Sequence, residues 1–69
     1  MARRRALQER LFGAAVLKAS FRLRGEEAGA AFRAIYPGVL RDLQLEDAQV
    51  EEFIARHREE VEAAARGKA

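Results

Sequence analysis

The chain has no cysteine and a single histidine, His57, and these two shortages exclude the devices that stabilise many very small proteins. Without cysteine there is no disulfide, and one histidine supplies too few donors for a structural zinc site. At 69 residues, a single hydrophobic core seldom contributes more than about 3–5 kcal/mol of net stability. Oligomerisation is the source of stability that remains, so the sequence predicts a homo-oligomer, with a dimer as the first expectation.

Residues that favour β-strands are also scarce, and threonine, asparagine and tryptophan are absent. The chain is rich in strong helix formers, with 15 Ala, 11 Arg and 9 Glu, and such a composition favours helices over strands. We therefore expect one all-α domain over residues 1–69, a small helical hairpin or bundle of three to four helices with long first and last helices, completed by dimerisation. Residues 1–5 are predicted to form a flexible basic arm and residues 67–69 a frayed end.

The first predicted helix ends at Gly25, and its apolar pattern, traced from Leu7, covers two sides. With about 100° between successive residues, the first apolar seam contains Leu7, Leu11, Ala14, Leu17 and Phe21. The second seam contains Phe12, Val16, Ala19 and Leu23. Three short helices do not easily cover both seams, so we expect the second seam to be the self-association interface. Lys18 falls within the first seam, where we expect its ammonium group to reach water.

Two breaks are predicted farther along the chain. Glu26 and Glu27 suit the start of a second helix, and Pro37 followed by Gly38 is expected to end it at Tyr36. A short segment follows, with inward-facing side chains at Val39, Leu40 and Leu43.

The last predicted helix covers about residues 47–66. Its N-cap is Glu46, with Gln49 completing a capping box, or else Asp47 with the frame shifted by one residue. Gly67 is expected to end this helix.

Charge is distributed unevenly along the chain. Residues 1–24 carry seven basic residues and one acidic residue, a net charge of +6, whereas residues 25–69 carry six basic and ten acidic residues, a net charge of −4. We expect the basic first helix to contact acidic groups of the same fold or of a second copy. The alternative is that nucleic-acid phosphates contact the basic residues near the start of the chain, Arg3, Arg4, Arg5 and Arg10.

Groups suited to catalysis are few, because the nucleophiles comprise Ser20, Tyr36 and two lysines, with no neighbouring base and orienting acid. We therefore expect no enzyme and no cofactor. His57 lies in the middle of the apolar stripe of the last helix, and we expect a neutral histidine at the edge of the core, bonded to a carboxylate or carbonyl oxygen. The alternative is a ligand-binding or pH-sensing residue that, with Glu60, holds a metal or ligand between two chains.

These expectations combine into one functional hypothesis, a non-catalytic helical interaction module that forms homodimers and serves as an accessory or regulatory subunit for a larger protein partner. The alternative is a small basic protein associated with DNA or RNA through its arginine cluster and first helix. A membrane span is not expected, because the apolar run from Leu11 to Leu17 has seven residues, whereas a span needs about 20. The arginine- and alanine-rich amphipathic start of the chain resembles a mitochondrial presequence. The lack of cysteine is neutral about the redox compartment, so a cytoplasmic location is the default.

Overall fold

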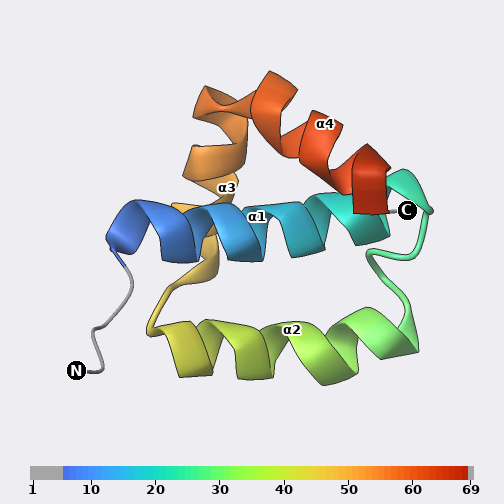
Figure 1. Ribbon diagram of the computed structural model, residues 1–69. Coiled ribbons are helices and arrows are strands. Elements are labelled where there is room, and N and C mark those ends of the chain that lie inside the picture. Colours follow the sequence, from blue (N-terminus) through green and yellow to red (C-terminus); the bar gives the residue numbers. More distant parts are fainter. Residues whose placement is uncertain (1–5, 69) are drawn as a thin grey trace.

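The computed structural model describes residues 6–68, and within that range it consists of four helices. They are α1 (Leu7–Leu23), α2 (Ala30–Leu43), α3 (Asp47–Arg56) and α4 (Arg58–Lys68). The predicted small all-α bundle is thereby confirmed. Figure 1 shows α1 in the middle of the molecule, with α2 on one side and α3 and α4 on the other. Within residues 6–68, none of the helices combines the length and apolar character needed to cross a membrane.

The core is built largely from small side chains. Helix α1 buries Ala14, Ala15 and Ala19, and α4 buries Val61 and Ala65. Because alanine adds so little bulk, α1 and α4 approach each other closely along this contact. Larger side chains from α3 and the loop before it, at Leu45, Val50, Phe53 and Ile54, complete the cluster.

The C-terminal end of α1 and the start of α3 follow the sequence prediction. Gly25 has a φ of +72°, a conformation that glycine adopts without steric cost. The amide of Glu26 donates to the carbonyl of Phe21 at 2.8 Å, which is the Schellman arrangement of a helix end. At the start of α3, the amide of Glu46 donates to the Gln49 side chain at 2.9 Å, as a capping box requires.

The predicted break at Pro37 is wrong. Helix α2 begins at Ala30, later than expected, and continues through Pro37 to Leu43. Proline removes one helical hydrogen bond, but the apolar residues on both sides of it pack toward the core, including Tyr36 before it and Val39, Leu40 and Leu43 after it. Packing against the rest of the chain therefore outweighs the local preference of proline. The helix ends instead at Gln44, whose φ is +58°.

The single long C-terminal helix is also wrong, because the chain turns at His57. The backbone of His57 has φ −124° and ψ 38°, outside the helical range. The turn redirects α4 so that its residues Val61 and Ala65 become buried in the core. A straight helix leaving the molecule would keep this face exposed to solvent. The burial of the face therefore accounts for the break. Helix α4 then continues through Gly67 to Lys68, two residues beyond the expected end at residue 66, so residues 67 and 68 are helical where a frayed end was predicted.

Candidate interaction site

A buried lysine lies where α1, α2 and α3 meet. Lys18 is 5% exposed, so the prediction that its ammonium group reaches water is wrong. Its Nζ atom donates to Oδ1 of Asp47 at 2.7 Å and forms an ion pair with Glu51. The hydroxyl of Tyr36 donates to the same Oδ1 atom at 2.6 Å. One lysine thus joins three helices, because its side chain is too deep to reach solvent and is satisfied by carboxylates instead.

A second cation extends this cluster toward the surface. Arg22 donates two hydrogen bonds to the carboxylate of Glu27, at 2.9 and 2.7 Å, and a third to Glu51 at 2.9 Å. Two parallel N–H···O bonds to one carboxylate form a directional pair that suits arginine. Glu27 therefore anchors the α1–α2 loop instead of beginning a helix. The expected contact between the basic first helix and acidic groups of the same chain is present here.

These contacts shift the pKa values of the acidic groups. Hydrogen bonds from Lys18 and Tyr36 hold the pKa of Asp47 below its usual range, and the bond from Lys18 likewise lowers the pKa of Glu51. The bond from Arg22 lowers the pKa of Glu27. In each case the hydrogen bond favours the charged form and outweighs the desolvation that opposes it.

The donors in the cluster shift in the opposite direction. Burial alone would lower the pKa of Lys18, but the hydrogen bonds and charges of Asp47 and Glu51 outweigh it and raise that pKa. Burial and the hydrogen bond to Asp47 raise the pKa of Tyr36 well above its usual value. Both groups therefore keep their protons in the folded protein up to high pH.

We expect acid to weaken the fold through this cluster. The carboxyl pKa values of Asp47, Glu51 and Glu27 are lower in the folded chain than in the unfolded chain. The stability they contribute is thus complete above the ordinary carboxyl pKa of about 4 and is lost as pH falls through the lowered values. Urea denaturation followed by circular dichroism should give a lower midpoint at about pH 3 than at about pH 6. Asp47→Asn should reduce this difference, and equal midpoints at the two pH values would contradict the expectation.

The candidate interaction surface is a groove between α1 and α2. It has a volume of about 530 Å³ and is lined by Glu9, Phe12, Gly13, Val16, Leu17, Ser20, Val39 and Leu43. Two exposed apolar side chains, Leu23 and Ile35, lie on the same helices. At about 100° per residue, Leu23 projects in nearly the same direction as Val16, and Ile35 lies one turn before Val39. We call these ten residues the α1–α2 groove.

The second seam of α1 is partly covered by the chain itself. Val16 and Ala19 are each 4% exposed, whereas Phe12 is 37% and Leu23 46% exposed. The expectation of a fully open seam overlooked the turn at His57, which places α4 against α1. Val16 therefore forms part of the groove, and Phe12 and Leu23 remain available to a partner. Self-association itself stays a prediction.

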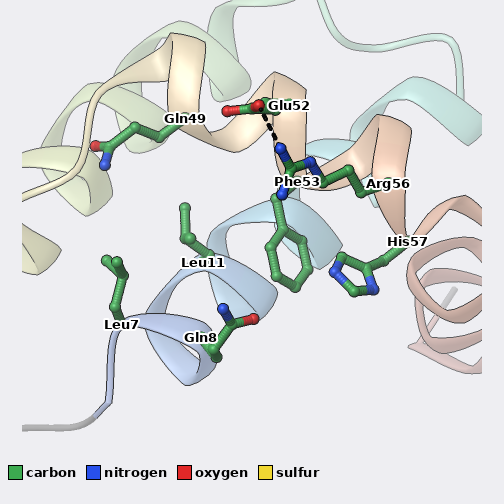
Figure 2. A pocket seen from close by; sticks show the side chains of 8 residues that line it. All are labelled: Leu7, Gln8, Leu11, Gln49, Glu52, Phe53, Arg56 and His57. Carbon is green, nitrogen blue, oxygen red and sulfur yellow. Dashed lines mark hydrogen bonds and ion pairs between the residues drawn. The ribbon is translucent and has the colours of Figure 1, made fainter.

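His57 lies in a smaller pocket between the start of α1 and the end of α3. Figure 2 shows its ring beside Phe53, with Leu7 and Leu11 on the facing helix. The His57 and Phe53 ring centroids are 4.4 Å apart, and Nδ1 of His57 lies 3.1 Å from a carboxylate oxygen of Glu60. This contact agrees with the expected histidine at the core edge. The pocket has a volume of about 200 Å³, below the range of about 300–1,000 Å³ typical of ligand sites.

The described part of the fold adds no further metal-ligating side chains around His57 and Glu60. Within residues 6–68, no group of three or more histidine, cysteine, aspartate or glutamate side chains is arranged to hold a metal ion. A metal shared between two chains through His57 and Glu60 stays a prediction.

Of the four residues predicted to contact nucleic acid, Arg10 lies within the part of the chain that the structure describes. Arg3, Arg4 and Arg5 lie outside the described residues. The Arg10 guanidinium is partly buried and donates to the backbone carbonyl of Leu43 at 2.7 Å. This bond satisfies a carbonyl at the end of α2 and aligns α2 with α1. Nucleic-acid binding therefore stays a prediction that depends on the first five residues.

Comparison with known proteins adds no relative, because no family model, curated protein or solved structure matches the chain.

Proposed function

We propose that this chain is a non-catalytic interaction module that forms a homodimer through the α1–α2 groove and presents its other surfaces to a larger protein partner. The observation that carries the proposal is the groove itself, in which apolar side chains of two helices remain open to solvent beside exposed Leu23 and Ile35. Contiguous apolar surface of this kind is typical of protein interfaces.

The state of the potential nucleophiles supports a non-catalytic role. The Ser20 hydroxyl donates to the Val16 carbonyl at 2.8 Å, and the Tyr36 hydroxyl donates to Asp47. The Lys18 ammonium is held by carboxylates. Each group thus has a structural partner, and the Asp47 carboxylate that accepts from Tyr36 is itself held in an ion pair with Lys18.

The lining of the groove favours a protein over a small ligand. Its polar residues are Glu9 and Ser20, and the Ser20 hydroxyl is already bonded to the backbone. A small ligand needs several placed polar groups to fix its orientation. A helical partner needs mainly apolar contact along the two helices. A second copy of the chain is such a partner, and dimerisation supplies the stability that a core of this size lacks.

Ile35→Glu tests this proposal. Ile35 is 47% exposed, so a charged side chain there leaves the monomer folded but places two unpaired carboxylates in the dimer interface. Sedimentation equilibrium should show at least a tenfold weaker dimer, equivalent to about 1.4 kcal/mol. Ala55→Glu introduces the same charge on the exposed side of α3 and should leave the dimer unchanged. Equal dissociation constants for the two variants would contradict the proposed interface.

A further inference from the structure

We propose that two copies pack their α1–α2 grooves together in an antiparallel two-fold arrangement, with Glu9 of each copy facing Arg24 of the other. This inference rests on the proposed dimer and adds its orientation and its ion pairs. A two-fold interface uses the same surface on both copies, so its residues must complement themselves after rotation.

The groove side of α1 has this property. Glu9, Gly13, Val16, Leu17, Ser20 and Arg24 project within a sector of about 100° on the helix. Rotation about a point between Val16 and Leu17 places Glu9 opposite Arg24, Gly13 opposite Ser20, and Val16 opposite Leu17. Acid thus meets base at both ends, where Arg24 also pairs with Glu26 of its own chain at 3.0 Å. Val16 and Ser20 near the axis are already covered within the single chain, at 4% and 6% exposed, so the charges at the ends set the orientation. A parallel arrangement would instead place Glu9 beside Glu9 of the second copy, which is unfavourable.

The alignment of α2 with α1 provides an independent check. The Arg10 side chain reaches the carbonyl of Leu43, and the rings of Phe21 and Phe32 pack with centroids 5.2 Å apart. These contacts at the two ends show that α2 runs antiparallel to α1. They also place the point between Val16 and Leu17 of α1 beside the point between residues 36 and 37 of α2.

The same two-fold axis also pairs a large with a small residue on α2. Rotation about the point between residues 36 and 37 places Ile35 opposite Gly38 of the second copy, and these two positions project about 60° apart on the helix. Ile35 is exposed in the single chain, and Gly38 is partly buried. Large side chains opposite small ones allow two helices to interdigitate. The position of the axis was set by the charges of α1, so this match on α2 is a separate observation.

Two glycines inside helices agree with a close approach on this face. A Cβ atom added at Gly13 or Gly38 would meet nothing within 4 Å. Packing within the single chain therefore does not require glycine at either position, although glycine weakens a helix relative to alanine. Both positions lie on the surfaces that the two-fold arrangement brings together.

Charge reversal tests the arrangement. Glu9→Arg and Arg24→Glu each place two pairs of like charges at the ends of the interface, and each should weaken the dimer about tenfold by sedimentation equilibrium. The double variant carries both changes in one chain and restores opposite charges, so its dissociation constant should return to within about threefold of the parent value. Glu59→Arg, on the exposed side of α4, is the matched control and should have no effect. Circular dichroism of each variant at low concentration checks that the monomer remains helical.

Gly38→Leu provides a test that does not depend on charge. A Cβ atom at this position meets nothing within 4 Å in the single chain, and leucine replaces a poor helix former, so the monomer should be at least as stable. In the dimer it would collide with Ile35 of the second copy, and association should fall more than tenfold. Additive weakening in the charge-reversal double variant, or an unaffected Gly38→Leu dimer, would overturn the antiparallel arrangement. Failure of the proposed homodimer itself is distinct, because the parent chain would then be monomeric throughout.

Discussion

Lys18→Ala is expected to lower the free energy of unfolding by about 3 kcal/mol, the low end of the range for breaking a buried ion pair. The substitution removes the cation that lies between Asp47 and Glu51. It leaves these carboxylates close to each other with less compensation, although their side chains are about half exposed and water screens part of the repulsion. It also leaves a cavity beside the Tyr36 ring, over which the lysine ammonium lies. Since the domain has only about 3–5 kcal/mol to lose, most of the chain should unfold at moderate temperature.

Urea denaturation at a fixed low protein concentration measures this effect without interference from dimer formation. Arg58→Ala is the matched control, because it removes a cation from an exposed ion pair with Glu62, and it should change stability by less than about 0.5 kcal/mol. Equal losses for the two variants would show that Lys18 contributes no more than a surface residue. Lys18→Met should fall between them, because it fills the space but removes the cation from Asp47 and leaves Glu51 paired with Arg22 alone.

Phe53→Ala is expected to have an equal or larger effect, a loss of about 3–5 kcal/mol. Phe53 is 8% exposed and belongs to the core cluster. Its ring makes an edge contact with Phe12 at 6.3 Å and lies against the His57 ring. Removing it takes away the contact that holds His57 at the turn between α3 and α4, as well as a large apolar surface in the core.

Thermal unfolding followed by circular dichroism should show little cooperative transition for Phe53→Ala. Leu7→Ala serves as the control, because Leu7 lines the same pocket but is 45% exposed. That variant should lose less than about 1 kcal/mol, since little of its surface is buried. A cooperative transition of Phe53→Ala near the parent temperature would contradict the core described here.

The sequence was informative where local chemistry decides the structure. The end of α1 at Gly25 and the N-cap at Glu46 depend on a few neighbouring residues, and both were predicted from them. The apolar pattern also showed that α1 has two seams, because burial on different sides of a helix leaves a clear spacing along the sequence.

The errors arose where distant parts of the chain decide the structure. Pro37 and the turn at His57 depend on which face of a helix is buried against α1, and this information is absent from the local sequence. The burial of Lys18 could not be predicted either, because its partners Asp47 and Glu51 lie 29 or more residues away in sequence but beside it in space. Asp47 and Glu51 are four residues apart, so both lie on one side of α3. This spacing was the one signal in the sequence of an acidic pair that could face the lysine.

The groove was predictable only in part. Phe12 and Leu23 were recognised on α1 from their helical spacing, and both are exposed as a partner would require. The contribution of α2 was missed, because the predicted break at Pro37 separated Ile35 from Val39 and Leu43. Once α2 is continuous, these residues fall along one side of it and complete the groove with α1.

The most direct test of a homodimer built on the α1–α2 groove is the molar mass of the purified chain in solution, by size-exclusion chromatography with light scattering at low and high salt. We expect a mass near twice 7.7 kDa. The dimer should persist at high salt because its interface is mainly apolar, and salt should weaken it only modestly by screening the Glu9–Arg24 pairs. A mass near 7.7 kDa at every protein concentration and in both salt conditions would contradict it.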